Sequence, residues 1–483
     1  MKKEFKILII LFFIAFILRA IFLFSSPVRI WDETVYANLG HDLTSNFFDY
    51  SLSSNKWSDF IPSGGDEVYT WPKMGFRAPL LPYVLSSFYL LNLDFMVPFF
   101  IPFMGALSVI FIYILGKELF NSKVGLFSSL LFLFIPLHIA FSARILTDVL
   151  FTFFVILTFL SFWKGYEKNN KKYKVFFGLF LALALLSRYT AIWIMPIFPI
   201  YLLIRNKSFR FLKDKHLWFA ILVFFATLIP WFVYSFFNYN NPFGAFIHGF
   251  KASAYWGGLQ SWHFFFDYWF KMFSIMGFVF VIALIYIIYK KYYFKKEIYF
   301  LLIWFFFFFG MAVYMPHKED RFILAITPVI ALISGYFIDK INKHKKLIFA
   351  AIILTALIYL GFHFSWIYNS YYTDTNKCFL EGNKFLRGVN MNSVVFTDES
   401  PVVYYYTKLE TRFYPVPLTY ENINNNLRDM DFGKDIYVLF GNYVKKPNQE
   451  DKKIMADLND NFHKVFSCVE GDAFSFVYKY AGK

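Results

Sequence analysis

Residues 5–24 read FKILIILFFIAFILRAIFLF, and Trp31-Asp32-Glu33 follows shortly after. The first stretch is an apolar run of about 20 residues, the length that an α-helix needs to cross a bilayer. It lacks the small-residue cleavage site of a secretory signal peptide. An acidic pair at the mouth of a membrane helix is costly to bury, so ionisable groups there are functional candidates. The stretch therefore predicts a membrane protein with a candidate site just beyond its first span.

The composition of the whole chain extends this prediction. Of its 483 residues, 58% are hydrophobic and 17% are charged, whereas soluble domains average about 25% charged residues. The net charge of +15 does not indicate nucleic-acid binding. The Lys and Arg residues lie largely in short loops between apolar runs, as the positive-inside rule requires, and no basic stripe with a reader domain is visible. We expect a polytopic membrane protein in contact with lipids and no nucleic-acid partner.

Further apolar runs predict about eleven membrane spans. They lie near residues 6–25, 95–115, 123–140, 147–164, 173–187, 189–205, 217–236, 269–289, 297–314, 322–338 and 347–367. Residues 78–91 are also apolar, but the run is short. If it crossed the membrane, every later cationic loop would change sides. We therefore place it as an interfacial or re-entrant helix on the outer face.

The cationic loops give the orientation. They fall in residues 2–6, 117–123, 164–174, 205–215, 290–296 and 340–346. With eleven spans all of them lie on one side, which the positive-inside rule identifies as the cytoplasm. The N-terminus is then cytoplasmic in a multi-pass protein of the cell membrane. The loop 26–93 and the C-terminal segment lie outside.

The chain divides into two predicted domains. Residues 1–368 form the transmembrane domain with its outer loop 26–93, and residues 369–483 form a small soluble extracytoplasmic α/β domain. Alternating apolar residues predict strands at 394–397, 435–440 and 474–480, and a short helix at 402–407. The fold class is thus mainly α, a polytopic helix bundle with a small α/β domain. Cys378 and Cys468 both fall in that domain, where a disulfide and two free thiols are both open.

The acidic pair Asp32 and Glu33 is the first candidate site. A carboxylate at the outer surface could take a proton from an acceptor hydroxyl. It could also bind a cation, and such a pair could hold Mg²⁺ or Mn²⁺ through oxygen ligands. The alternative is structural, since acids at a helix N-terminus complement the helix dipole. No His or Cys ligand motif, P-loop, GxGxxG or HExxH is present.

A second candidate lies in the short loop before the predicted span at 147–164. Arg144 and Asp148 are four residues apart, so they would share a helix face and could pair. Thr147-Asp148 also lies where a helix would begin. The pair is either a structural ion pair with a cap or a second carboxylate that faces the same outer cavity.

The third candidate is cationic. Arg321 follows His317-Lys318-Glu319-Asp320 and enters a predicted span, where a guanidinium suits a phosphate at headgroup depth. Lys318, Arg77, Arg144 and Arg188 are further phosphate candidates, and snorkelling to lipid headgroups is the alternative. An enzyme on the outer face needs a donor that crosses the membrane already activated. A lipid phosphate meets that need.

Four segments occur in a familiar order: Asp32-Glu33 with Tyr36, Arg77-Ala-Pro-Leu-Leu-Pro-Tyr83, Ala143-Arg-Ile-Leu-Thr-Asp148, and Arg321-Phe-Ile-Leu-Ala-Ile-Thr-Pro328. Together they resemble the GT-C superfamily of glycosyltransferases that use polyprenyl-phosphate sugars. The resemblance covers roughly residues 1–340 and is nearest to the protein O-mannosyltransferase and aminoarabinose transferase branch, glycosyltransferase family 39.

The resemblance implies inverting transfer of a sugar from a polyprenyl (dolichyl) phosphate to a protein or lipid-linked glycan. It implies that Asp32 acts as the base on the acceptor or positions it, with Glu33 beside it and Asp148 as the second acid. The donor phosphate would lie against Arg321, with Arg188, Arg77, Arg144 and Lys318 as further candidates. The Trp-Trp-Asp-Tyr-Gly signature of oligosaccharyltransferases is absent from the sequence, as is the insertion expected of eukaryotic protein mannosyltransferases. A protein acceptor and a glycan acceptor therefore both remain open.

Two other functions are compatible with a polytopic chain. A transporter or flippase of lipid-linked sugars would need acids at mid-membrane depth and internal repeats, whereas the charges here lie at helix ends. A membrane scaffold with an outer binding domain would leave Asp32, Asp148 and Arg321 without a role.

Overall fold

A computed structural model gives the fold. It describes residues 2–24, 29, 31–52, 75–255, 259–341, 345–371, 376–397, 399–412, 434–442, 455–456, 458–459, 462–470 and 473–480. By its internal contacts the chain forms two compact units. The first comprises Met1–Phe24, Ala78–Leu81 and Pro98–Phe364, and the second comprises Ser25–Arg77, Pro82–Val97 and Ser365–Lys483. The domain boundary between residues 368 and 369 stays a prediction.

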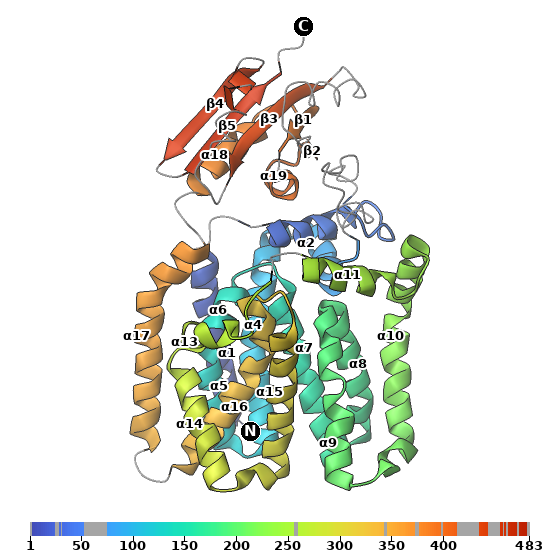
Figure 1. Cartoon of the computed structure of the whole chain (residues 1–483), viewed down its shortest axis with the longest axis vertical. Coiled ribbons are helices and arrows are strands. Elements are labelled where there is room, and N and C mark those ends of the chain that lie inside the picture. The colour runs from blue at the N-terminus through green and yellow to red at the C-terminus, as the bar shows by residue number, and fades with distance from the viewer. Residues whose placement is uncertain are drawn as a thin grey trace. The chain divides into compact units, whose positions relative to one another are not determined.

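The first unit is a bundle of helices, most of which run side by side (Figure 1). Its helices are α1 (Lys2–Phe24), α4 (Val97–Leu119), α5 (Ser122–Leu133), α6 (Pro136–Ser142), α7 (Thr147–Phe162), η5 (Trp163–Glu167), α8 (Lys171–Ser187), η6 (Tyr189–Ile194), α9 (Ile197–Asn206), η7 (Phe209–Lys213), α10 (Lys215–Tyr239), α11 (Gly244–Tyr255), α12 (Phe264–Asp267), α13 (Trp269–Phe273), α14 (Ile275–Tyr289), η8 (Tyr292–Phe294), α15 (Lys296–Tyr314), η9 (Asp320–Ile326), α16 (Thr327–Lys340) and most of α17 (Lys345–Tyr371).

The apolar runs of the sequence fall on these helices. Within the described residues, six helices are long and apolar enough to cross a membrane, and a bent pair would make a seventh. Helices α8, α14 and α17 occupy other predicted positions. The number eleven stays a prediction. The mainly α fold with a small C-terminal sheet is confirmed.

Several predicted spans are broken rather than continuous. The bent pair is α5 and α6, which meet at 62°, with Pro136 at the first turn of α6. Proline suits a helix start because its missing N–H is not needed there. Helices α13 and α14 are separated by Ser274, whose φ of 51° lies in the left-handed region that ends a right-handed helix.

Arg19 ties α1 to α6 inside the first unit. Its side chain is fully buried. The guanidinium donates to Ser142 Oγ at 3.2 Å, to His138 Nδ1 at 3.0 Å and to Ala15 O at 3.0 Å. A buried arginine needs hydrogen-bond acceptors to offset its lost hydration, and these three supply them.

The second unit contains a five-stranded mixed sheet. Its strands are β1 (Ser393–Phe396), β2 (Glu410–Arg412), β3 (Asp435–Asn442), β4 (His463–Glu470) and β5 (Ala473–Lys479). Their order is β2-β1-β3-β5-β4. Strand β1 pairs in parallel with β2 and β3, whereas β5 pairs antiparallel with β3 and β4. The three predicted strands and the helix α19 (Ser400–Thr407) are confirmed.

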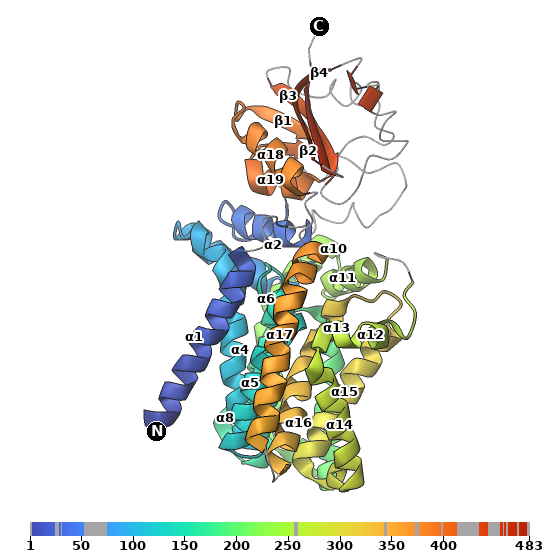
Figure 2. The ribbon, with the colours of Figure 1, turned by 90° about the vertical axis from the view of Figure 1, so that its left-hand side faces the viewer.

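The sheet buries both of its faces because apolar residues lie at successive positions of its central strands. On one face Val395, Leu439 and Val477 pack with residues of α18 (Asn376–Arg387) and α19. Figure 2 shows both helices on that side of the strands. On the other face Val394 and Val438 pack with further strand residues and with Leu458 and Phe462. Strands β1 and β3, which pair in parallel, thus have apolar residues on both faces, as in α/β proteins.

Two short helices precede α4. Helix α2 (Trp31–Asp42) carries the acidic pair in its first turn, and α3 (Leu80–Leu90) is the apolar segment before η4 (Asp94–Met96). With 11 residues, α3 extends about 16 Å, too short to cross a hydrocarbon core of about 30 Å. A Cβ on Gly40 of α2 would meet Pro82 O at 3.0 Å, so the two helices are in close contact.

Candidate functional site

Asp32 lies in the first turn of α2 and faces a guanidinium. Its Oδ1 is 2.9 Å from Arg77 Nη2, and the side chains of Asp32 and Arg77 are 23% and 16% exposed. The Arg77 guanidinium also lies over the Tyr36 ring, 5.3 Å from its centroid. Residues 32 and 36 are one helical turn apart, so both reach the same cation. Asp32 is therefore an oriented carboxylate that solvent can still reach.

The Arg77 guanidinium stays protonated. Burial alone would lower the pKa of its guanidinium, but the neighbouring Asp32 carboxylate and the Tyr36 side chain outweigh that effect and raise it. A permanent cation beside Asp32 favours the anionic form of that acid. The ionised carboxylate is the form that a general base requires.

Glu33 has a different environment from its neighbour. Its side chain is fully buried, and its Oε1 is 3.3 Å from Arg29 Nη1. Successive residues of a helix point about 100° apart, so Asp32 and Glu33 meet different cations. Glu33 thus faces inward and pairs with Arg29, and the spacing of four residues between them indicates this pair in the sequence.

Asp148 in the first unit is almost completely enclosed. It lies in the first turn of α7, its side chain is 2% exposed, and its Oδ1 pairs with Arg188 Nη1. Arg188 caps the junction between α8 and η6 in an extended conformation. Its guanidinium carbon lies 5.0 Å from the centroid of the Phe322 ring. This cation–π contact joins the α8–η6 junction to η9.

The predicted helix face shared by Arg144 and Asp148 is wrong. Helix α7 begins at Thr147, as the sequence indicated, so Arg144 lies before the helix, in a bend between α6 and α7. Arg144 is buried at 4% exposure. The ion pair at Asp148 reaches Arg188, forty residues away, and no local spacing could show that contact.

Arg321 lies at the start of η9 and holds a carboxylate. Its Nε is 2.6 Å from Glu319 Oε2, and its Nη2 donates to Glu319 Oε1 at 2.9 Å. His317 Nε2 is 3.0 Å from the same Oε1. The Nη2 contact is a hydrogen bond and the Nε contact an ion pair, and a guanidinium that binds a carboxylate also suits a phosphate. Arg321 precedes Phe322, so the Arg188 and Arg321 regions adjoin within this unit.

Lys318 is largely committed to the backbone. Its ammonium donates to Met315 O at 2.6 Å and to Gln260 O at 3.2 Å. The residue is only 4% exposed, and burial lowers the pKa of its side chain. These two bonds link the turn before η9 to residue 260. Lys318 is therefore the weakest of the predicted phosphate ligands.

The predicted site residues thus form two groups. Asp32, Glu33 and Arg77 belong to the second unit. The others, Arg144, Asp148, Arg188, Lys318 and Arg321, belong to the first. Across the residues that the structure describes, no group of three or more His, Cys, Asp or Glu side chains could hold a metal ion. The divalent cation stays a prediction.

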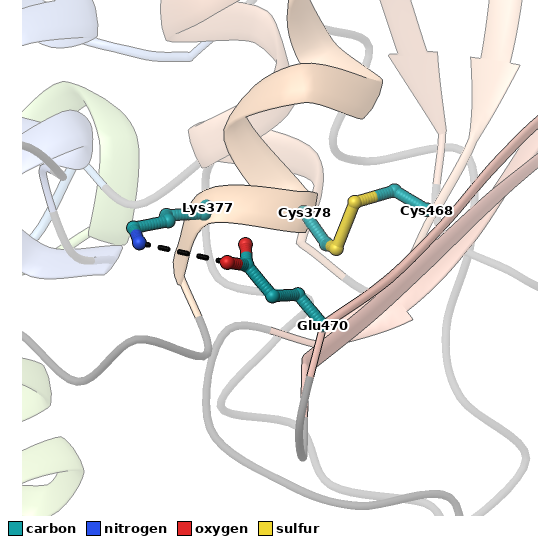
Figure 3. The surroundings of a disulfide bond; sticks show 4 residues. All are labelled: Lys377, Cys378, Cys468 and Glu470. Carbon is teal, nitrogen blue, oxygen red and sulfur yellow. Dashed lines mark ion pairs between the residues drawn. A yellow bond between two sulfur atoms is a disulfide. The ribbon is translucent and has the colours of Figure 1, made fainter.

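Cys378 and Cys468 form a disulfide, which the sequence left open (Figure 3). The bond joins α18 to β4 across 90 residues, with the two Cα atoms 5.3 Å apart. Beside it Lys377 Nζ lies 3.7 Å from Glu470 Oε1. The disulfide fixes α18 against the antiparallel edge of the sheet.

Comparison with solved structures places this arrangement among known folds. The crystal structure of ArnT from Cupriavidus metallidurans bound to undecaprenyl phosphate matches with a TM-score of 0.74. The match covers 98% of this chain and 97% of that chain, at 12% identity. The chain has the GT-C glycosyltransferase fold. The apo state of the same ArnT matches with a TM-score of 0.75, at 12% identity over 99% and 98% of the two chains.

The GT-C fold extends to larger proteins. The oligosaccharyltransferase AglB from Archaeoglobus fulgidus, in complex with an inhibitory peptide and a dolichol-phosphate, matches with a TM-score of 0.59. That match covers 98% of this chain and 74% of AglB, at 14% identity. A comparison with curated protein sequences finds no match.

The family model described as dolichyl-phosphate-mannose-protein mannosyltransferase matches residues 76–234, less than half of the chain. Arg77, Arg144, Asp148 and Arg188 lie within that range, whereas Asp32 and Arg321 lie outside it. The family match and the GT-C fold together indicate a glycosyltransferase. With its apolar helices, the chain is a multi-pass membrane protein.

Proposed function

We propose that this protein transfers a sugar from a polyprenyl (dolichyl)-phosphate donor to a protein or lipid-linked glycan on the outer face of the membrane. The observation that carries the proposal is an oriented, accessible carboxylate, Asp32, in a chain with the GT-C fold. The family match over residues 76–234 supports a donor of the lipid-phosphate class. The undecaprenyl phosphate bound in ArnT supports it too.

Asp32 is the base in this mechanism. As the acceptor oxygen attacks C1 of the sugar, its proton passes to the Asp32 carboxylate. The bond between C1 and the phosphate oxygen breaks, and polyprenyl phosphate leaves with the electron pair. Attack opposite to the leaving group inverts the configuration at C1. The 23% exposure of Asp32 allows an acceptor hydroxyl to reach it, and Arg77 favours the ionised acid.

The cations of the first unit suit the leaving phosphate. A lipid phosphate leaves readily when fixed positive charges match its charge. We propose Arg321 as the principal ligand and Arg188 as the second. Arg321 already binds the Glu319 carboxylate, and a phosphate would compete with that carboxylate for the guanidinium. Arg144 and Lys318 are buried further from solvent, and Arg77 is engaged with Asp32.

Two observations support the proposed orientation, with the N-terminus in the cytoplasm. The cationic loops fall on one side if the predicted spans hold. The Cys378–Cys468 disulfide is typical of an oxidising compartment outside the cytoplasm. Both support the proposal that the C-terminal sheet lies outside.

The test is transfer of radiolabelled sugar from polyprenyl-phosphate donors by the purified protein in detergent. Wild type, Asp32→Asn and Asp49→Asn would be compared. Asp49 is a matched control because it lies in the exposed loop after α2, where it accepts a hydrogen bond from Ser51 Oγ at 2.6 Å. We expect label to leave the donor with wild type and Asp49→Asn only.

The fraction that gains the label identifies the acceptor class. Donor movement across liposomes without cleavage would instead establish a flippase and refute the proposal. Normal turnover by folded Asp32→Asn would refute the assignment of the base. A loss of turnover in EDTA that Mg²⁺ or Mn²⁺ restores would establish the predicted divalent cation.

A further inference from the structure

Helix α2, which carries the proposed base, is bonded directly to α19 of the C-terminal sheet domain. The backbone N–H of Arg29, just before α2, donates to Tyr406 Oη at 2.7 Å. One end of the contact thus lies near Asp32. Asn38 Nδ2, two turns further along, donates to Pro401 O at 2.8 Å. The two bonds hold α2 against α19 at two separate points.

Apolar packing and burial reinforce these bonds. Trp31 packs against the core formed by α18, α19 and the sheet. Glu33 and Asn38 are fully buried, and Arg29 is 8% exposed. The α2–α19 contact lies within one compact unit. The α2–α19 contact is therefore buried and closely packed, and does not consist of surface hydrogen bonds alone.

The α2–α19 contact contains one buried cation and one buried anion, Arg29 and Glu33. Arg29 and Glu33 pair at 3.3 Å. Burial, together with the charge of Glu33, raises the pKa of Tyr406, although Arg29 opposes the shift. Burial also raises the pKa of Tyr405. Both hydroxyls therefore stay neutral at ordinary pH, and Tyr406 can accept the Arg29 hydrogen bond throughout.

Tyr406 is itself fixed within the sheet domain. Arg387 of α18 donates from Nε and Nη2 to Tyr406 O, at 2.9 and 2.7 Å. Helix α18 is in turn joined to β4 by the Cys378–Cys468 disulfide. A continuous path of covalent and hydrogen bonds thus runs from the sheet to the residues next to Asp32.

We infer that the C-terminal domain positions the base: Tyr406 and Asn38 hold α2 on α19 so that Asp32 keeps its orientation toward Arg77. This inference rests on the proposed function for the meaning of Asp32. Tyr406 and Asn38 are positioning residues, because they act through α2 and not on a substrate. The sheet domain and the base then move as one body, and any acceptor that binds the domain is brought to Asp32 in a fixed orientation.

The test removes one hydroxyl. Tyr406→Phe keeps the ring and deletes the acceptor of the Arg29 bond. Tyr478→Phe is the matched control, since Tyr478 is fully buried in the same domain and its hydroxyl has no hydrogen-bond partner in the part of the chain that the structure describes. Losing one neutral hydrogen bond costs about 1 kcal/mol, so we expect amide hydrogen exchange in α2 to rise about threefold to tenfold in Tyr406→Phe only.

Two readouts separate positioning from mere stabilisation. In Tyr406→Phe we expect the acidic limb of the pH–rate profile to move to higher pH, because Asp32 loses part of its contact with cationic Arg77. A smaller amount of folded enzyme would lower the rate without moving that limb. Asn38→Ala should shift the limb in the same direction.

The outcomes can be told apart. Unchanged exchange in α2 of both Tyr406→Phe and Asn38→Ala would overturn the inference, whatever the activity. Faster exchange in α2 with an unshifted acidic limb would also overturn it, since the contact would then be structural only. Faster exchange together with the shift would support it. Absence of transfer by wild type would count against the proposed function alone, because the exchange experiment needs no turnover.

Discussion

Two acid–guanidinium pairs, one in each unit, use the same chemistry with opposite exposure. In the second unit Asp32 is 23% exposed against Arg77 at 16%. In the first unit Asp148 is 2% exposed against Arg188 at 18%. The accessible member is thus the acid in one pair and the cation in the other. On the proposed function, this difference predicts that Asp32 reacts with the acceptor, whereas Asp148 holds Arg188 in place.

The largest expected effect tests the reactive pair. Asp32→Asn should lower kcat by about 10²–10⁴-fold, the usual contribution of a general base. The melting temperature should change little, because the side chain is partly exposed. Steady-state transfer kinetics and a thermal melt check both parts. The same loss of rate in Asp49→Asn would make the effect non-specific and would break the comparison.

The next effect separates the two units by stability. Cys378→Ser opens a loop of 90 residues, and loop-closure entropy for that length corresponds to about 4–5 kcal/mol as an upper value. We expect the transition of the sheet domain to move to lower temperature and that of the helix bundle to stay. Differential scanning calorimetry with and without reductant measures this. A shift of the bundle transition alone would contradict it.

Asp148→Asn should act on stability more than on chemistry. It leaves the Arg188 guanidinium without its carboxylate, a loss that costs about 3–5 kcal/mol for a buried pair. The lower end is expected, since Arg188 keeps some exposure. Thermal unfolding in detergent is the measurement, and the double variant with Arg188→Gln should recover part of the loss. Normal stability with a hundredfold lower kcat would instead make Asp148 catalytic.

The smallest effect concerns the ring that Arg188 covers. Phe322→Leu keeps an apolar side chain but removes the cation–π contact, which is worth about 0.5–2 kcal/mol. We expect the KM for the donor to rise a few-fold with kcat retained. The matched control is Phe308→Leu, a buried phenylalanine of α15 that packs against other rings. An equal rise of KM in both variants would remove Arg188 from the donor site.

The sequence predicted the membrane helices and much of the sheet because both depend on local periodicity. It could not predict the breaks near Pro136 and Ser274, since the flanking residues remain apolar. Strand β4 was missed for a different reason. Most of its residues are exposed, so it lacks the alternation that marks a half-buried strand.

The candidate charges were found because ionisable residues are rare beside membrane helices. The sequence says less about which of these charges pair with each other. Asp148 reaches Arg188 through the tertiary fold, whereas the local spacing favoured Arg144. The pairing of Arg29 with Glu33 was local and could have been found from its spacing of four. The contact of Tyr406 with Arg29 spans 377 residues and follows only from the fold.

The buried Arg19 has a consequence for how the chain is made. During synthesis α1 enters the bilayer before α6 exists, so Arg19 has neither His138 nor Ser142 as a partner. An arginine in a lone membrane helix costs about 2.5–3.5 kcal/mol at the centre and less near an end, where it snorkels to the interface. Until α6 is made, we expect α1 to remain at the translocon or to place Arg19 at the membrane surface. We therefore expect the bonds from Arg19 to α6 to form late in membrane assembly, once α6 has been inserted.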